Sequence, residues 1–267
     1  MPTTGQIIEK LLSQNMERLA DTVDTIKTGA ADKPVRRIAV TFLADVDVIR
    51  RAVAAGCDFI ITHEPTFYGH HDNTEQLDDD PVYQYKRKLL DDNGVTVFRY
   101  HDHIHMHCPD LITAGILDAL GWMDYADTEE EDDGEQFTGI VSLPDATAGE
   151  VAAHVREKLG GVSHFIGDTN AKVGTVGLML GSPGFGHHHY ALRKYNPDLI
   201  ICGEVNEWET PVYVKDSIAA GLGGALLVVG HCASEQAGMA YFAKKLQAML
   251  PDVPVEFIPS AATYQLL

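Results

Sequence analysis

Two short stretches of this chain, Asp58-Phe59-Ile60-Ile61-Thr62-His63-Glu64 and Asp198-Leu199-Ile200-Ile201-Cys202-Gly203-Glu204, align almost residue for residue. Each contains a four-residue apolar run of the kind that forms a buried strand. Pro65 helps to end the first strand, because proline cannot donate a hydrogen bond to a β ladder. We interpret the pair as equivalent strands of two related lobes. The alternative is that any two buried strands of an α/β protein look alike.

Predicted helices and strands alternate on both sides of these stretches. The apolar spacing predicts one long helix over residues 4–27, which places Ile7, Leu11, Met16 and Leu19 on one face. The other elements follow in chain order: strand 37–43, helix 46–54, strand 59–62, helix 81–92, strand 95–100, strand 173–180, a helix containing 190–195, strand 199–202, helix 212–220, strand 225–229, helix 234–249 and strand 253–258. This alternation predicts the α/β class with mainly parallel sheets and right-handed crossovers.

The charge distribution suggests where one lobe ends and what the protein does not bind. Eight of the 39 acidic residues lie in 124–135, which has no Lys or Arg. We therefore expect an N-terminal lobe over 1–126, an acidic linker over 127–136 and a C-terminal lobe over 137–267. The net charge of −19 leaves no basic stripe for phosphates, which argues against a duplex nucleic-acid surface.

The cellular setting is also an expectation from the sequence. No apolar stretch approaches the ~18 residues that a membrane span requires. The first residues, MPTTGQIIEK, lack the order of a signal peptide. None of the four cysteines forms a C-x-x-C pair, so they are expected to be reduced thiols. We expect a cytoplasmic protein without membrane partners.

Histidines follow three of the predicted strands. His63, His101 and His231 each stand at the carboxyl end of a strand, and open α/β sheets bind their ligands beyond those ends. Two related lobes would place equivalent strand ends across a shared metal cleft. His63 is followed by Glu64, and His231 precedes Glu235 by four residues around a strand-to-helix turn. Imidazole and carboxylate both bind transition metals, whereas the alternatives are solvated loop residues or a helix-capping carboxylate.

The most unusual segment is Tyr100-His101-Asp102-His103-Ile104-His105-Met106-His107. If it is extended, its period of two places all four histidines on one face. A row of imidazoles beside an apolar strand is costly unless each finds a partner, and a metal would serve several of them. The alternative is a solvated histidine-rich loop.

Four motifs together resemble a known family. The stretch ITHEP (61–65) resembles a strand-terminal His-His-Pro motif, and YHDHIHMH (100–107) resembles a motif in which a His is followed four residues later by Asp. The stretch ICGEVNE (201–207) resembles a strand end with the motif Thr-Gly-Glu/Asp, and GHCASE (230–235) resembles the motif Gly-His-x-x-[Ser/Thr]-Glu. The family is the dinuclear-metal NGG-interacting-factor-three family, also called type-two GTP cyclohydrolase I. Motif order and spacing agree from the first helix to residue 258.

The resemblance implies a set of metal ligands at His63, Glu64, His105, His231 and Glu235, with His101 as an additional motif histidine. Glu64 replaces the second family histidine and His105 replaces a metal-bridging aspartate, so the two look like a compensating exchange. Imidazole bridges two metals poorly, so Glu64, Glu235 or Asp102 would have to bridge. One metal ion per chain therefore remains an alternative to two.

The resemblance also implies a ring-shaped homohexamer and a hydrolase-like activity. We expect a metal-dependent hydrolase-like protein with a small-molecule substrate, for which a nucleotide or related heterocycle is the candidate. Zn, Fe, Mn or Ni would be the metal, with one or two per chain. No catalytic residue is assigned beyond the ligands. The alternative is a metal-binding scaffold or metal-handling assembly without turnover, and an open coordination position would favour the enzyme.

Overall fold

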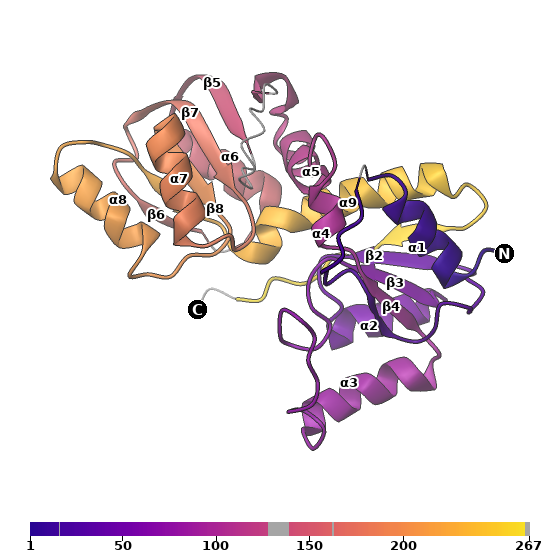
Figure 1. Ribbon diagram of the computed structural model, residues 1–267. Coiled ribbons are helices and arrows are strands. Elements are labelled where there is room, and N and C mark those ends of the chain that lie inside the picture. The colour runs from indigo at the N-terminus through magenta and orange to yellow at the C-terminus, as the bar shows by residue number, and fades with distance from the viewer. Residues whose placement is uncertain (16, 128–138, 162, 265–267) are drawn as a thin grey trace. The chain divides into compact units, whose positions relative to one another are not determined.

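The structure is a computed structural model that describes residues 1–15, 17–127, 139–161 and 163–264 (Figure 1). The chain forms two compact units. Unit 1 consists of Met1–Ile112 with Gly238–Ala261, and unit 2 of Thr113–Ala237 with Ala262–Leu267. Each unit contains one five-stranded sheet, which confirms the α/β class. The predicted boundary between the lobes, the linker 127–136, differs from the observed division into units, because the last strand of the chain pairs with a strand of unit 1. Apart from Asp127, the residues of the predicted linker lie outside the described residues.

The sheet of unit 1 has the strand order β1-β4-β3-β2-β10. Strands β10, β2, β3 and β4 are parallel, and β1 is antiparallel to β4. The buried apolar runs of the sequence form these strands, whose bounds are β1 Ile26–Thr28, β2 Ile38–Thr41, β3 Phe59–Thr62, β4 Thr96–Arg99 and β10 Val255–Phe257. Both faces of the three central strands are buried, as continuous apolar runs in a parallel sheet require.

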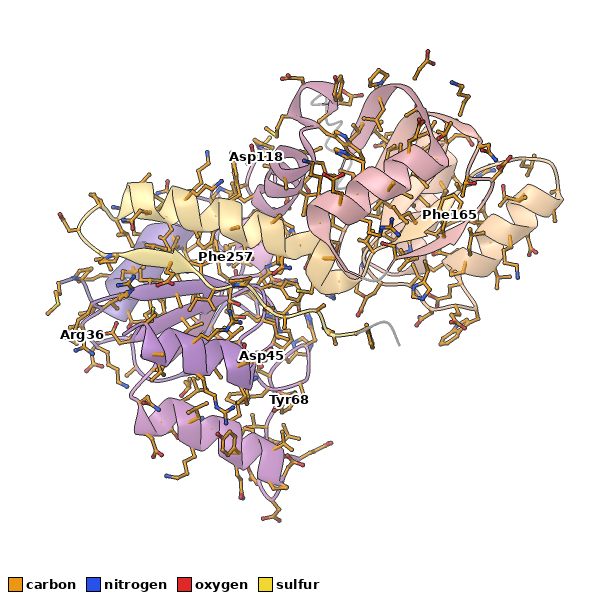
Figure 2. The ribbon with its side chains drawn as sticks, turned by 180° about the vertical axis from the view of Figure 1, so that it is seen from behind. Arg36, Asp45, Tyr68, Asp118, Phe165 and Phe257 are labelled. Carbon is orange, nitrogen blue, oxygen red and sulfur yellow. The ribbon has the colours of Figure 1, made fainter. Side chains whose placement is uncertain are left out.

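Helices pack on both faces of this sheet. Ala39, Ile60 and Val97 pack in one cluster with residues of two helices, α2 Val46–Ala54 and α3 Pro81–Asp92. On the other face, the ring of Phe242 in α9 His231–Met249 lies 5.2 Å from that of Tyr100. Both α2 and α3 begin at the predicted residues because Asp45 and Asp80 cap their first turns. Asp45 is labelled at the start of α2 in Figure 2.

The first helix is shorter than predicted. The structure shows α1 Thr4–Leu12, which starts at a capping box on Thr3, and the predicted helix over 4–27 is wrong beyond Leu12. Met16 lies outside the described residues. The backbone N–H groups of Leu19 and Val23 donate to the side chains of His103 and Asp102, so they are not available to a continuing helix. Tertiary hydrogen bonds therefore override the local apolar spacing.

The sheet of unit 2 has the order β5-β7-β8-β9-β6. The three middle strands are parallel and both edge strands are antiparallel. The bounds are β5 Ile140–Thr147, β6 His164–Ile166, β7 Lys172–Met179, β8 Leu199–Cys202 and β9 Leu226–Val228. The two aligned stretches therefore form β3 and β8, the middle strand of each sheet, with a parallel neighbour on either side.

Further helical elements of the described residues are α5 Leu111–Leu120, the 3-10 turn η1 Met123–Tyr125, α6 Ala148–Leu159, α7 Phe185–Tyr195 and α8 Thr210–Ala219. Ala191 of α7 and Val214 of α8 pack in one cluster with Ile200 of β8 and Leu226 of β9. All four cysteines are free thiols. Among the described helices, none combines the length and apolar character needed to cross a bilayer.

Candidate metal centre

His63 and Glu64 follow β3 directly, at the carboxyl end of the middle strand of unit 1. His63 is fully buried, and its backbone N–H donates to carbonyl oxygens after β2. Its Nδ1 lies 3.2 Å from the carbonyl oxygen of Tyr100, so Nδ1 carries the proton and donates to that oxygen. The strand end therefore fixes both the position and the tautomer of this imidazole.

The histidine-rich segment after β4 is a short helix, α4 Asp102–His105, and the predicted extended row of four histidines is wrong. The cause is the buried carboxylate of Asp24. One of its oxygens accepts from the backbone N–H of His101 at 2.6 Å and of Asp102 at 3.0 Å, and the other accepts from that of His103 at 2.9 Å. A carboxylate that satisfies the first amides of a helical turn stabilises that turn.

Helical geometry sorts the four histidines into two groups. His101 and His105, four residues apart, lie on one side and approach His63. His103 instead donates from Nδ1 to Asp24 at 2.8 Å and accepts at Nε2 from the Leu19 N–H. His107 meets the Tyr100 hydroxyl at 3.0 Å. Two of the four are therefore structural, and two belong to the site.

Three imidazoles form a compact cluster. His63 and His101 stack at 4.6 Å between ring centroids, and His105 lies edge-on to them at 5.1 and 5.4 Å. One ring nitrogen from each residue lies within 4.8 Å of those of the other two. The three residues are therefore close enough to form a group that could hold one metal ion.

Each of these imidazoles is held through its Nδ1 atom by a separate acceptor. His63 donates to the Tyr100 carbonyl at 3.2 Å, His101 to Asp102 at 2.9 Å and His105 to Asp110 at 2.5 Å. Metal-binding histidines show the same arrangement, in which the second nitrogen donates to a carboxylate or carbonyl and the ring is thereby oriented. The donor set therefore fits a transition-metal ion on grounds of geometry and tautomer together.

Asp102 orients His101 and does not reach out as a bridging ligand. Besides His101, it accepts from the Thr22 hydroxyl at 2.7 Å and from the Val23 N–H at 3.0 Å. Burial alone would raise the pKa of Asp102, but these hydrogen bonds outweigh it and hold the pKa well below its usual range. Burial lowers the pKa of His101, with smaller contributions from His63 and His105, so its ring is neutral near pH 7. Neutral imidazole is the form that binds metals.

Glu64 lies between His101 and a buried guanidinium. Its Oε1 is 3.6 Å from His101 Nε2, and its Oε2 is 3.6 Å from Arg99 Nη2. Arg99 is fully buried and also donates to the carbonyl oxygens of His63 and His70. Arg99 therefore both braces the end of β3 and supplies the positive charge opposite Glu64.

His231 and Glu235 lie together in unit 2, in the first turns of α9. His231 Nε2 is 2.9 Å from Glu235 Oε2, and His231 Nδ1 is 3.6 Å from the carboxylate of Glu204. Glu235 is buried, whereas His231 is partly exposed. The four-residue spacing thus places both on one side of the helix. The sequence analysis expected a strand-to-helix turn between them, but α9 begins at His231, three residues before the predicted start at 234.

Two glycines allow the loops of unit 2 to approach this turn. A Cβ on Gly181, whose φ is +66°, would lie 2.2 Å from Glu235 Oε1. A Cβ on Gly203 would lie 2.6 Å from Ser234 Oγ, which accepts from the Gly181 N–H at 3.0 Å and donates to the His231 carbonyl oxygen at 2.7 Å. The ends of β7 and β8 are therefore shaped around the His231–Glu235 pair.

Sequence reasoning missed three residues that hold the site together. Asp24, Arg99 and Asp110 bear no motif, and only Asp110, five residues after His105, is close enough in sequence to suggest a partner. Arg99 ends a strand that the pattern marks as fully buried, and a buried charge calls for a partner. Asp24 acts across 77 residues, which no local pattern reveals.

Comparison with solved structures finds the same fold in three proteins whose chains this chain matches along almost their whole length. The Bacillus cereus protein related to NIF3 is 16% identical, with a TM-score of 0.76, and the match covers 100% of this chain and 99% of that one. The Staphylococcus aureus protein SA1388 is 14% identical, with a TM-score of 0.73, and the match covers 99% of this chain and 99% of that one. The NIF3 superfamily protein from Sphaerobacter thermophilus is 13% identical, with a TM-score of 0.55, and the match covers 96% of this chain and 98% of that one.

Sequence comparison identifies the family. Among curated proteins, none matches this chain. A family model described as Duf34/NIF3 (NGG1p interacting factor 3) matches residues 4–263, which is nearly the whole sequence. The chain therefore belongs to the Duf34/NIF3 family.

Proposed function

We propose that this protein is a metal-dependent hydrolase that binds a divalent transition metal through His63, His101 and His105, with Glu64 beside them. The observation that carries the proposal is the set of three imidazoles, each held at Nδ1 by its own acceptor. Imidazoles oriented in this way through Nδ1 are usual around metals.

We further propose that His231 and Glu235 bind a metal ion that serves the same hydrolase function. Their support is the Gly-His-x-x-Ser-Glu motif, the 2.9 Å pair that they form, and the glycines that surround it. Nitrogen and carboxylate donors favour Zn, Fe, Mn or Ni over Mg or Ca. One or two ions per chain are compatible with this donor set.

A bound metal of this kind lowers the pKa of a water molecule and polarises an electrophile. The residues of the chain supply the rest. A carboxylate oxygen of Glu64 or Glu235 accepts a proton and returns it to the leaving group. Arg99, with its fixed positive charge, lies 3.6 Å from Glu64 and orients its carboxylate. Asp102 and Asp110 keep the Nδ1 protons of their histidines in place.

The assembly and the substrate belong to the same proposal. We propose a closed homo-oligomer, most simply a hexamer, that acts on a small molecule, with a nucleotide or related heterocycle as the first candidate. Light scattering at physiological salt tests the assembly, and a particle of one chain's mass, 29.2 kDa, would contradict it.

Metal content tests the centre directly. Protein purified without added metal is analysed for bound elements, together with His63→Ala, His105→Ala and His231→Ala. Each variant should lose metal while retaining its circular dichroism spectrum. His71→Ala is the matched control, because this exposed imidazole contacts only the ring of His70 among the ring pairs of the region. Full occupancy in all three site variants would contradict the proposal, and a loaded protein that turns over nothing in a hydrolase screen would favour a scaffold.

A further inference from the structure

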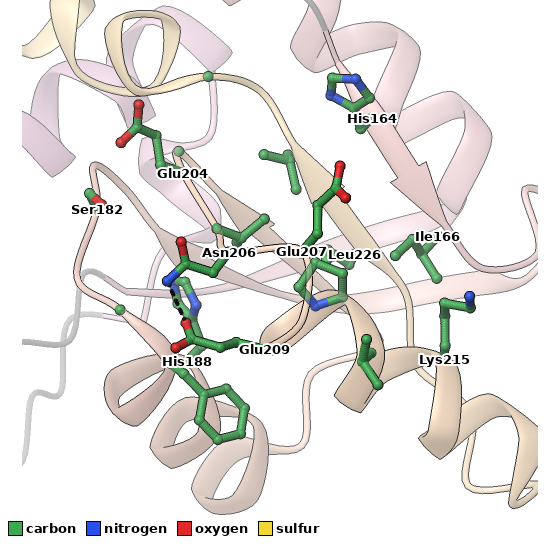
Figure 3. A pocket seen from close by; sticks show the side chains of 18 of the residues that line it. His164, Ile166, Ser182, His188, Glu204, Asn206, Glu207, Glu209, Lys215 and Leu226 are labelled. Atoms are coloured by element: carbon green, nitrogen blue, oxygen red, sulfur yellow. Dashed lines mark hydrogen bonds between the residues drawn. The ribbon is translucent and has the colours of Figure 1, made fainter.

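Unit 2 contains a pocket of about 650 Å³ that the metal ligands do not fill (Figure 3). It lies between the sheet and the starts of α7 and α8, and every residue that lines it belongs to unit 2. Its volume falls within the roughly 300–1,000 Å³ that small-molecule sites occupy. Glu204, one of the lining residues, also approaches His231 Nδ1 at 3.6 Å, so one side chain contacts both the pocket and the His231–Glu235 pair.

One wall of the pocket is a flat patch of the sheet. Strands β6 and β9 are antiparallel, and two directly opposed pairs, His164 with Val228 and Ile166 with Leu226, line the pocket. Residues two apart on a strand point to the same face. Leu226 is fully buried, so the accessible platform consists of the side chains of His164, Ile166 and Val228. Phe185 from α7 adds an aromatic ring to the lining. A flat, largely apolar wall suits the face of a planar ring.

His188 is a buried polar residue of the pocket lining. The side chain comes from α7 and is 1% exposed, and its Nδ1 lies 2.8 Å from the Thr210 hydroxyl. Its Nε2 is buried, and no described residue offers it a hydrogen-bond partner. Burial lowers the pKa of His188 to about 4, with His187 contributing, so the ring is neutral at pH 7. A buried nitrogen in this state costs free energy that a ligand's hydrogen bond would recover.

The polar groups of the pocket are mainly acceptors. Glu204, Glu207 and Glu209 stand against a single lysine, Lys215, and Asn206 donates to Glu209 at 3.0 Å (Figure 3). Three carboxylates repel phosphate or any other anion. They are suited to N–H donors at the edge of a ring, which carboxylates accept strongly.

We propose that this pocket binds a planar nitrogen heterocycle that carries an exocyclic amino group, with no phosphate inside the pocket. The heterocycle stacks on the platform of β6 and β9, its N–H groups donate to the glutamates, and its ring edge pairs with His188 Nε2. The pocket would thus hold the organic part of the substrate. Only that last statement rests on the proposed hydrolase function, because binding does not require a metal.

Binding is tested with metal-free protein and four bases that form two matched pairs. Cytosine differs from uracil, and adenine from hypoxanthine, by an amino group in place of an oxo group. Titration calorimetry measures affinity, and the fluorescence of Trp208 reports occupancy locally. Trp208 is 74% exposed and lies between two lining glutamates, whereas the other tryptophan, Trp122, is buried.

We expect at least one amino base to bind about tenfold more tightly than its oxo partner, since a hydrogen-bonding site rejects the analogue that lacks the donor. Glu207→Gln and His188→Leu should each weaken that binding about tenfold. Asp216→Asn, which removes an exposed carboxylate of α8 outside the lining, should leave it unchanged. Glu207 is a surface carboxylate, so its variant remains informative even where His188→Leu fails to fold.

Three results would overturn the inference: equal affinity within both pairs, no binding of either amino base by folded protein, or tighter binding of inorganic phosphate or spermidine at the same site. A protein that binds an amino base but no metal would support this pocket while contradicting the proposed hydrolase. A protein that binds metal but neither amino base would do the reverse. The two proposals therefore fail separately.

Discussion

The pairing of Glu64 with Arg99 predicts that Glu64→Gln destabilises the metal-free protein. The two charged groups are 3.6 Å apart, and the side chains are 13% and 0% exposed. At that distance, an effective dielectric constant near 20 gives an attraction of about 4–5 kcal/mol. Arg99 keeps its hydrogen bonds to two carbonyl oxygens in the variant, and Glu64 is partly hydrated, so only part of this attraction is lost. We expect the free energy of unfolding to fall by about 2–3 kcal/mol.

The measurement is urea unfolding of chelator-treated protein, followed by circular dichroism. Asp92→Asn is the matched control, because its partner Lys88 lies at 2.8 Å but the two side chains are 57% and 74% exposed. An exposed pair of this kind contributes at most about 0.5 kcal/mol. Arg99→Met and the double variant complete a cycle, in which the two losses should be far from additive. If Glu64→Gln costs no more than Asp92→Asn, the charge of Arg99 is compensated elsewhere and Glu64 serves only as a ligand.

Three further outcomes follow from the site and its surroundings. Asp110→Asn should weaken metal binding by about 10–100-fold in a chelator competition, because the His105 ring loses its charged partner; unchanged affinity would mean that His105 is not a ligand. His188→Asn should flatten the pH dependence of stability. The folded pKa of about 4 lies below the ordinary 6.5, so the unfolded state takes up the proton first and wild-type stability falls as pH drops from 7 towards 4. At pH 5 that loss is about 2 kcal/mol, which urea titrations at pH 7 and 5 would show as missing in the variant. Gly181→Ala should displace Glu235 and reduce metal content, whereas Gly186→Ala, where a Cβ meets open space, should not; equal metal content in both would contradict the role given to Gly181.

The three central strands of each sheet, β10 and most helices could be predicted because their apolar residues follow a clear pattern within single elements, whereas the edge strands β1, β5 and β6 were not predicted. Helices 46–54 and 81–92 are confirmed with those bounds, since each begins at an aspartate cap and is amphipathic. The histidine-rich segment could not be predicted in this way. The segment forms a helical turn in which Ile104 is buried and the four histidines point to different sides. Whether it forms this turn or an extended strand depends on Asp24, which lies far away in the sequence.

The sequence motifs identified the candidate ligands, but they did not identify the groups that hold those ligands in place. His63, His101 and His105 lie together in unit 1, and His231 and Glu235 lie together in unit 2, as the motifs suggested for each. The acceptors on the Nδ1 atoms include a backbone carbonyl, that of Tyr100, which no residue type marks. Arg99 was missed because it lies inside the predicted strand 95–100 and belongs to none of the four motifs.

The place of β10 in the first sheet has a consequence for the order of events on the ribosome. Its hydrogen-bonding partner is β2, which is synthesised more than 200 residues earlier. At about 5–20 residues per second, β2 is without this neighbour for about 10–40 s of translation. During that interval Ile38–Thr41 is an open sheet edge, the kind of surface that pairs with other nascent chains. Shielding by a chaperone should therefore matter for the yield of this protein until Val255–Phe257 emerges and pairs with β2.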